Sequence, residues 1–417
     1  MDNLTHSLVG LLCADVVARA CDRRGALAPW PRAALYVFAI VGNNLPDLDF
    51  SYSRISGREF GYLLQHRGYT HTLPAVLGFA LALLAVFAAL SRWRGRRLER
   101  RDWWVLSGVA LASPLLHIVM DFANNYGVHP FWPLHDAWFY GDSFFILEPG
   151  FWLVIVAPLA WSYRSRWARG ALWLVLGVAL ASLWYQDFVP MRNALAWSAL
   201  TLALLVLSRG LAPRACSLLA LGCFLAVAAL FVGGSRVAKR IVLEQARASY
   251  PRATVIDIVA TPTPANPFCW GMILVQAEAG RYSVRIGRAA TFPAWLEAAA
   301  CPHDRAAHPT ALLQPMHLPA PGDARLVLGS EYLLPVASFQ QVFRERCEAR
   351  AFFRWARVPY LTPARADGSR VLGDLRYDRN PGLDFSDIRL ARAQGRCPEY
   401  VPPWLPARAD ILDAPAR

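Results

Sequence analysis

Histidine and aspartate side chains recur at short spacing in a chain that is otherwise rich in apolar residues. They gather in residues 45–49, 66–71 and 117–121, and His6 adds a fourth segment near the start of the sequence. Ionisable groups near or inside a membrane are costly, and they commonly serve ion binding or catalysis. The pattern therefore predicts a divalent-metal site that is assembled from four separate segments.

Two of these groups have a spacing that can bring both side chains to one place. His117 and Asp121 are four positions apart, so on a helix they project from the same face. Asp47 and Asp49 follow Pro46, which disfavours helix at the residue before it. We therefore expect the two aspartates on a turn. In extended chain, side chains two positions apart point the same way. The alternative is a helix-end turn with two solvated acids.

The third group surrounds a glycine. His66 and His71 flank Arg67 and Gly68, and the glycine permits a tight backbone path. Thr72 is a candidate cap for an apolar helix that begins at the next residue. The planar guanidinium of Arg67 suits the oxygens of a phosphate. The alternatives are a topogenic arginine or a salt bridge to a neighbouring carboxylate.

Two further residues extend the candidate site. Asp2 and His6 repeat the four-residue spacing; Asp2 is either a helix cap or a ligand, whereas a histidine within an apolar helix favours ligation. Residues 124–149 are dense in aromatic and polar side chains, as in an interfacial aromatic belt or the wall of a substrate site. In the second interpretation, Asp142 is a further ligand or base.

The chemistry that this set predicts is metal-dependent hydrolysis. The candidate metal ligands are His6, Asp47, Asp49, His66, His71, His117 and Asp121. Imidazoles combined with carboxylates favour Zn²⁺, with Mn²⁺ or Fe²⁺ as alternatives, and this number of ligands fits one to three ions. A coordinated water would act as the nucleophile, with Asp49, Arg67 and Asp142 as candidate catalytic residues.

The apolar residues divide the chain into two parts. They make up 55% of the sequence, and the mean hydropathy is +0.28. A membrane helix needs roughly 20 mainly apolar residues, and we predict eight apolar segments, some of them short, at 4–18, 33–45, 73–90, 103–120, 151–163, 171–185, 194–208 and 215–232. The prediction is a polytopic α-helical membrane domain at 1–233, followed at 234–417 by a small soluble domain that is α+β or mainly β.

The net charge of +13 comes from arginine, because Lys239 is the single lysine. Much of the excess lies in short loops at 19–32, 92–101, 164–169 and 209–214, which the positive-inside rule assigns to the cytoplasm. This pattern predicts a multi-pass membrane protein and gives no reason to expect nucleic acid as a partner. Segments 46–72, 121–150 and 186–193 then face outward, and every candidate ligand falls on the outer side with the C-terminal domain.

The C-terminal half has the composition of strands separated by turns. We predict strands at 254–260, 271–277, 281–287, 325–328 and 351–358, with the second and third forming a hairpin. An outer location permits disulfides, and three pairings of Cys269, Cys301, Cys347 and Cys397 remain open. We expect the histidines at 303, 308 and 317 to be ordinary surface residues.

The order of the motifs resembles the bacterial membrane-bound metal-dependent hydrolase family, which is related to the LexA-binding inner-membrane hydrolases. The motifs that carry the resemblance are MDNLTH at 1–6, LPDLD at 45–49, HRGYTH at 66–71, His117 with Asp121, Asn124, Tyr126-Gly127, Trp132-Pro133 and YGDS at 140–143. Residues 261–270 more loosely resemble the start of the family's C-terminal domain. Two positions differ from the family pattern: Gln65 stands where a histidine is usual, and Glu148-Pro149-Gly150 replaces Asp-Pro-Trp.

The resemblance implies a distant relationship to the zinc-dependent phospholipase C and nuclease superfamily. It therefore implies a helical metal site formed by the seven ligands named above, cleavage of phosphoesters, and a membrane lipid or lipid-linked phosphate as substrate. Two other functions compete with this one. They are a non-catalytic scaffold that contains a metal, and a transporter, which the gathering of ionisable groups at one side of the membrane disfavours.

Overall fold

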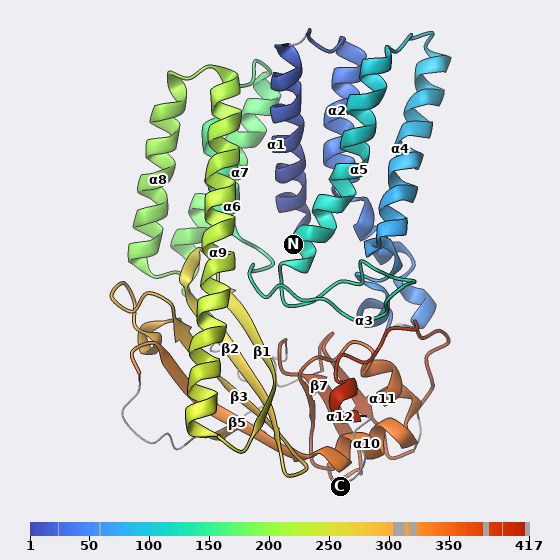
Figure 1. The fold of residues 1–417 in the computed structure, drawn as a ribbon, viewed down its shortest axis with the longest axis vertical. Coiled ribbons are helices and arrows are strands. Elements are labelled where there is room, and N and C mark those ends of the chain that lie inside the picture. Colours follow the sequence, from blue (N-terminus) through green and yellow to red (C-terminus); the bar gives the residue numbers. More distant parts are fainter. Residues whose placement is uncertain are drawn as a thin grey trace.

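A bundle of long helices stands on a domain built largely of strands (Figure 1). The computed structural model describes residues 1–23, 25–57, 60–302, 313–316, 323–377, 383–393 and 395–412. Six helices in these ranges are long and apolar enough to cross a membrane. The structure thus confirms the predicted fold class. The histidines at 303, 308 and 317 lie outside the described residues.

The helices of the bundle form two groups (Figure 1), and each predicted apolar segment overlaps one of them. The first group contains α1 (Asn3–Asp22), α2 (Pro29–Gly42), α4 (Leu73–Trp93) and α5 (Arg100–Phe122). The second group contains α6 (Pro149–Leu159), α7 (Arg166–Tyr185), α8 (Met191–Arg209) and α9 (Pro213–Ser249). The short α6 packs against α7, α8 and α9, and every one of its residues is buried. Helix α1 contacts both groups and joins them.

Capping residues fix where α1 and α4 begin. The Asp2 carboxylate accepts a hydrogen bond from the backbone N–H of Thr5 at 2.9 Å, so Asp2 is the cap of α1. The Thr72 hydroxyl accepts from the N–H of Ala75 at 3.2 Å and caps α4, as the sequence predicted. Each cap satisfies an N–H group that has no partner inside its helix.

Short helical turns fill the connection between α2 and α4. They are η1 (Leu45–Ser51), η2 (Ser53–Ser56), α3 (Gly61–Gln65) and η3 (Tyr69–His71). Asp47 and Asp49 lie on a turn, as expected, but the backbone there is the 3-10 helix η1 rather than extended chain. With about three residues per turn, the two carboxylates leave η1 in different directions: Asp47 lies near the Nε2 atoms of His71 and His117, and Asp49 near the Nδ1 atoms of His66 and His71.

The C-terminal domain contains two antiparallel sheets. The larger has the order β1-β2-β3-β5-β4, with β1 (Thr254–Thr263), β2 (Asn266–Glu278), β3 (Arg281–Ala290), β4 (Gln314–Pro315) and β5 (Leu326–Pro335). The smaller consists of β6 (Pro359–Leu361), β7 (Arg370–Asp374) and β8 (Asp387–Leu390). Ala279 and Gly280 both have positive φ at the β2–β3 turn, as a tight hairpin of this kind requires. This confirms the predicted hairpin.

Helices cover part of this domain, and one of them replaces a predicted strand. They are α10 (Val336–Glu345), α11 (Cys347–Phe352) and α12 (Ala409–Leu412), with the short η4 (Ala298–Ala300). The predicted strand at 351–358 is wrong, because α11 continues to residue 352 and turns follow. Nearly every side chain in this stretch is buried, so it lacks the alternation between core and solvent that a half-buried strand shows.

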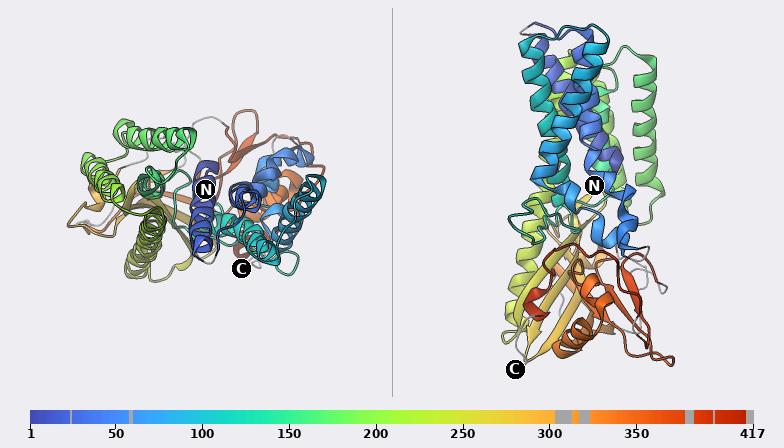
Figure 2. Two further views of the ribbon diagram at one scale, coloured as in Figure 1. Left: turned by 90° about the horizontal axis from the view of Figure 1, so that it is seen from above. Right: turned by 90° about the vertical axis from the view of Figure 1, so that its right-hand side faces the viewer.

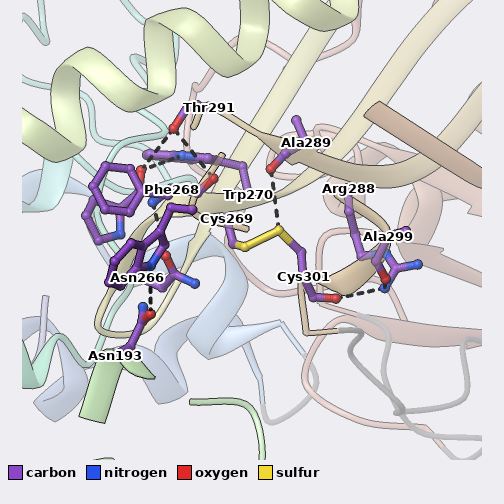
Figure 3. Close-up of a disulfide and its surroundings, with 12 residues drawn as sticks. Asn193, Asn266, Phe268, Cys269, Trp270, Arg288, Ala289, Thr291, Ala299 and Cys301 are labelled. Atoms are coloured by element: carbon purple, nitrogen blue, oxygen red, sulfur yellow. Dashed lines mark hydrogen bonds between the residues drawn. A yellow bond between two sulfur atoms is a disulfide. The ribbon is translucent and has the colours of Figure 1, made fainter. Parts of the chain in front are cut away.

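Two disulfides stabilise the C-terminal domain. Cys269 pairs with Cys301, and Cys347 pairs with Cys397, which selects one of the three possible pairings. Figure 3 shows the first disulfide, beside which Arg288 donates to the carbonyl of Cys301 at 2.8 Å. The remaining cysteines, Cys13, Cys21, Cys216 and Cys223, are free thiols in the helical bundle.

The C-terminal domain docks on one end of the bundle, as the right-hand view of Figure 2 shows. Helix α9 continues from the bundle along the larger sheet, so the predicted boundary at 233 falls inside a helix. The β1–β2 turn contacts the bundle through Ala265: its N–H donates to Glu148 at 3.1 Å, and its carbonyl accepts from Trp197 at 2.9 Å. Glu148 therefore links the start of α6 to this turn.

Residues 124–149 form another part of the docking surface. The indole N–H of Trp138 donates to the carbonyl of Arg354 at 2.6 Å. Asn125 donates to Thr261 at 2.7 Å and accepts from Tyr377 at 2.8 Å. The aromatic-rich loop thus packs against the C-terminal domain, next to the end of α5 that carries the candidate ligands.

Candidate metal centre

His117 presents one ring nitrogen to a cluster of predicted ligands. Its Nδ1 lies 2.8 Å from the carbonyl oxygen of Asn43, which can only accept a hydrogen bond. A proton therefore resides on Nδ1, and in the neutral ring Nε2 carries the lone pair. Nε2 lies 3.4 Å from Asp121, one turn further along α5, and 3.6 Å from Asp47.

His71 faces the same point from the opposite side. Its Nδ1 lies 3.4 Å from Oδ2 of Asp49, and a carboxylate at this position favours the proton on Nδ1. Its Nε2 lies 3.3 Å from Asp121 and 3.7 Å from Asp47. The Nε2 atoms of His71 and His117 are only 3.1 Å apart. At this distance either a proton on one Nε2 or a bound cation lies between the two rings.

These residues fit a divalent cation. Each of Asp47, His71, His117 and Asp121 offers one ligand atom, and these atoms lie within 4.8 Å of one another. Two imidazoles and two carboxylates match the donors that Zn²⁺ and related metals take. Oδ2 of Asp121 is buried and accepts no aligned hydrogen bond among the described residues, although Nε of Arg67 lies 2.8 Å from it. The cluster therefore has the ligand atoms that a bound cation would take.

A second group of possible ligands shares Asp47. Asp47, Asp49 and His66 also offer ligand atoms within 4.8 Å of one another. His66 Nδ1 lies 3.2 Å from Asp49, which also accepts from the backbone N–H of Arg67 at 2.7 Å. Burial would raise the pKa of Asp49, but hydrogen bonds from His66 and His71 outweigh it and hold the pKa below its usual value. Asp49 is therefore ionised and orients both imidazoles.

His6 lies directly beside the cluster. Its ring stacks on His117 with centroids 3.8 Å apart, and its Nε2 lies 3.2 Å from Oδ1 of Asp121. The α-amino group of Met1 contacts the same oxygen. Nδ1 of His6 is buried without a hydrogen-bond partner. The structure thus brings together all seven predicted ligands, from α1, η1, the HRGYTH loop and α5.

Arg67 lies inside the protein, with its guanidinium already engaged. Nη1 donates to Asn124 at 2.6 Å and to the carbonyl of Asp121 at 3.1 Å. Nε lies 2.8 Å from Oδ2 of Asp121, at ion-pair distance but without the alignment of a hydrogen bond. The side chain is 2% exposed. Of the predicted roles, the salt bridge to a neighbouring carboxylate is the one that the geometry favours.

Asp142 lies in a different cluster from the candidate ligands. Its carboxylate accepts two hydrogen bonds from Arg357, at 2.7 and 2.9 Å, and one from Lys239 at 2.6 Å. Arg357 also pairs with Asp257 at 2.8 Å. The structure therefore gives Asp142 a part in docking the C-terminal domain, rather than the role of ligand or base that the sequence suggested.

The cluster is most exposed at Asp47 and His66, whose side chains are 8% and 7% accessible, whereas the other ligands lie at 1% or less. Phe50 and Tyr62 stack on the ring of His66, at 4.6 and 4.9 Å between centroids. Leu48 and Phe50 are about half exposed. An apolar rim therefore borders the accessible side of the cluster.

Sequence reasoning missed several of these contacts. The Asn43 carbonyl that sets the tautomer of His117 is a backbone atom, so its residue type carries no signal. Asn124 belonged to the family motif, but its contact with Arg67 depends on the conformation of the HRGYTH loop. The stacking of Phe50 on His66 also depends on that folding, although an apolar residue directly after Asp49 was a visible signal.

Comparison with known proteins supports the family resemblance over the membrane half. Residues 1–189 match the family model of the YdjM inner membrane protein. This region contains every candidate ligand, and the match, together with the six apolar helices, establishes a membrane protein. The match ends before the C-terminal domain.

A relative with a similar sequence is the uncharacterized protein YfhP of Bacillus subtilis (strain 168), which is 25% identical over 138 residues. The aligned region covers 33% of this chain and 39% of that protein, so the chain spans about two fifths of the length of this relative. No solved structure matches the chain.

Proposed function

We propose that the protein is a membrane-bound, metal-dependent hydrolase. The observation that carries this proposal is the approach of the His71 and His117 Nε2 atoms to 3.1 Å, with the carboxylates of Asp47 and Asp121 beside them. A bound divalent cation would polarise a substrate oxygen and lower the pKa of a coordinated water. Zn²⁺ suits the donor set best, and Mn²⁺ and Fe²⁺ are alternatives.

The protein's own residues would prepare this site in three ways. Asn43 and Asp49 hold the protons of His117 and His71 on Nδ1, so that both Nε2 atoms keep their lone pairs. Arg67 fixes Asp121 from the side. Asp47, the most exposed carboxylate and common to both ligand groups, lies where it can accept a proton from a reacting water. This sharing of Asp47 supports a site for two ions.

For the substrate, we propose a phosphoester carried by a membrane lipid or by a lipid-linked molecule. The half-exposed Leu48 and Phe50 border the accessible side of the cluster. Val37 and Val41 are likewise exposed on the preceding helix, α2. Apolar side chains thus follow the chain from the bundle surface to the metal ligands, as acyl chains would require.

We further propose that the site faces the periplasm. The C-terminal domain carries both disulfides, and the free thiols lie in the bundle, as expected if that domain occupies an oxidising compartment. The metal centre lies at the same end of the bundle as this domain (Figure 1). Cysteine labelling in intact cells and in spheroplasts would test this orientation.

A direct test combines metal analysis with activity. Purified full-length protein should contain stoichiometric divalent metal and should hydrolyse phospholipids or lipid-linked phosphates presented in vesicles. Removing the metal with a chelator should abolish hydrolysis, and restoring Zn²⁺ or Mn²⁺ should recover it. Folded protein that binds metal but cleaves nothing in such a screen would overturn the hydrolase proposal.

That outcome would favour a second function, a scaffold with a structural metal. The observation behind it is the near-complete burial of His71, His117 and Asp121, because structural zinc sites are closed to solvent. Accessibility at Asp47 and His66 favours the catalytic alternative.

A further inference from the structure

Trp404 lies near the end of the described chain, yet it contacts the metal-ligand loop. It belongs to residues 398–408, which form neither helix nor strand and follow the cysteine that pairs with Cys347. A large side chain in such a tail is commonly exposed. Trp404 is instead fully buried, so its position requires a partner in another part of the structure.

That partner is the segment that leads into HRGYTH. The indole N–H of Trp404 donates to the carbonyl of Leu64 at 3.2 Å. The ring packs so closely on Gly68 that a Cβ atom there would lie 3.2 Å from Cζ2 of Trp404. It also contacts Tyr69, with centroids 4.8 Å apart. Trp404 therefore touches this segment before His66 and again between the two histidines.

The indole also contacts a second loop. His129 is fully buried and stacks on Trp404 with centroids 4.1 Å apart and planes at 19°. His129 also contacts Trp138, with centroids 3.8 Å apart. Burial lowers the pKa of His129 to about 3, so the ring is neutral and stacks as an apolar group. Trp404 thus joins the HRGYTH loop to the loop that follows α5.

The backbone of HRGYTH needs such support. Arg67 has a φ of 58°, in the left-handed region that is unfavourable for a residue with a side chain. Such conformations persist where the surrounding structure holds them in place. This conformation allows the side chain of Arg67 to reach Asp121 while His66 and His71 reach Asp49. A shift of the loop would therefore change several ligand positions together.

Other contacts hold the tail on this loop. The hydroxyl groups of Tyr400 and Tyr69 are hydrogen-bonded, and the N–H of Leu405 donates to the carbonyl of Asp136 at 3.1 Å. Arg354 of the C-terminal domain donates to the carbonyl of Trp404. The tail is thus fixed on both sides of the tryptophan.

We propose that Trp404 is a positioning residue of the metal centre, and that the tail at 398–408 acts as a clamp that sets the geometry of the HRGYTH ligands. This inference rests on the proposed metal site. It assigns a role toward that site to a part of the chain that lies beyond the region matching the family model.

The test compares two buried tryptophans in the full-length protein in detergent. Trp404→Ala should weaken Zn²⁺ binding, measured by chelator competition, about 10-fold or more, as the loss of groups that orient ligands does. It should also change the visible absorption spectrum of the Co²⁺-loaded protein, which reports ligand geometry. Trp270→Ala is the control: Trp270 is equally buried but packs against Gly234 of α9, so affinity and spectrum should remain as in the wild type.

A conservative variant keeps the test decisive if Trp404→Ala does not fold. Trp404→Phe retains an aromatic ring against His129 but loses the hydrogen bond to Leu64, so it should restore most of the affinity and the wild-type spectrum. A folded Trp404→Ala protein with wild-type affinity and spectrum would overturn the clamp, as would equal losses in Trp270→Ala. Wild-type protein that binds neither Zn²⁺ nor Co²⁺ would overturn the metal site itself.

Discussion

Two buried clusters of charged residues lie where the bundle meets the C-terminal domain, and they differ in how their polar atoms are satisfied. In the first, Asp142 and Asp257 surround Arg357, with Lys239 and Arg408 beside them. In the second, the metal centre, the Nε2 atoms of two histidines face each other and an oxygen of Asp121 has no hydrogen-bond partner.

The difference separates a structural cluster from a ligand site. Burial would lower the pKa of Arg357, but Asp142 and Asp257 outweigh it and hold the pKa above its usual value. The Asp142 cluster thus contains its own cations and holds two domains together. In the metal centre, the imidazole nitrogens and carboxylate oxygens outnumber the contacts that the neighbouring cations provide. This is expected for a site that takes a cation from solution.

The largest effect should follow from removing a ligand. His71→Ala takes away an imidazole whose Nε2 lies within 4 Å of both Asp47 and Asp121. We expect the bound metal to fall from stoichiometric to near zero, a loss greater than the roughly 10–100-fold caused by losing an orienting partner. Elemental analysis of purified protein measures this, with His135→Ala as the control at a residue outside the cluster. Undiminished metal content in His71→Ala would contradict the assignment.

Breaking the Asp142 cluster should have the opposite result: the protein should lose stability but keep its metal. Arg357→Ala leaves two buried carboxylates without their main partner, which typically costs about 3–5 kcal/mol. Thermal unfolding in detergent should show this loss, while the folded fraction retains its metal. Arg389→Ala is the matched control, because its ion pair with Asp367 is exposed and should contribute less than about 1 kcal/mol. Loss of metal affinity from folded Arg357→Ala protein would show that the two clusters are coupled.

An intermediate effect should follow from changing an orienting residue. Asp49→Asn keeps the shape of the side chain but removes the charge that holds His66 and His71. We expect metal affinity to fall about 10–100-fold with little change in the unfolding temperature, and metal titration measures it. A loss as complete as that of His71→Ala would instead make Asp49 a direct ligand.

The smallest effect should follow from changing the rim. Phe50→Ala removes an exposed ring from beside His66, and we expect a several-fold rise in KM for vesicle lipid with unchanged metal content. Activity on a short, water-soluble phosphodiester should stay at the wild-type level. Equal losses on both substrates would argue against an apolar entry path.

The sequence predicted the membrane helices and the identity of the candidate ligands better than it predicted their surroundings. Eight apolar segments were visible because membrane burial demands long runs of apolar residues. The ligands were visible because histidine and aspartate are rare in such surroundings. Asp142 carries the same chemical signal, and its role became clear only from the position of Arg357, more than 200 residues away.

Contacts over long sequence separations account for most of what the sequence could not show. No pattern near residue 404 indicates that its indole packs on Gly68, because the contact depends on how the C-terminal domain docks. The same holds for the disulfide pairing, which local spacing leaves open. The predicted strand at 351–358 failed because consecutive buried aromatic side chains also fit a short helix and turns.

The most direct test of the account is metal analysis of the purified full-length protein, combined with anomalous scattering from crystals. The account predicts at least one divalent ion per chain, located between the Nε2 atoms of His71 and His117 and in contact with Asp47 and Asp121. Folded protein that holds no metal there after exposure to Zn²⁺, Mn²⁺ and Fe²⁺ would contradict it.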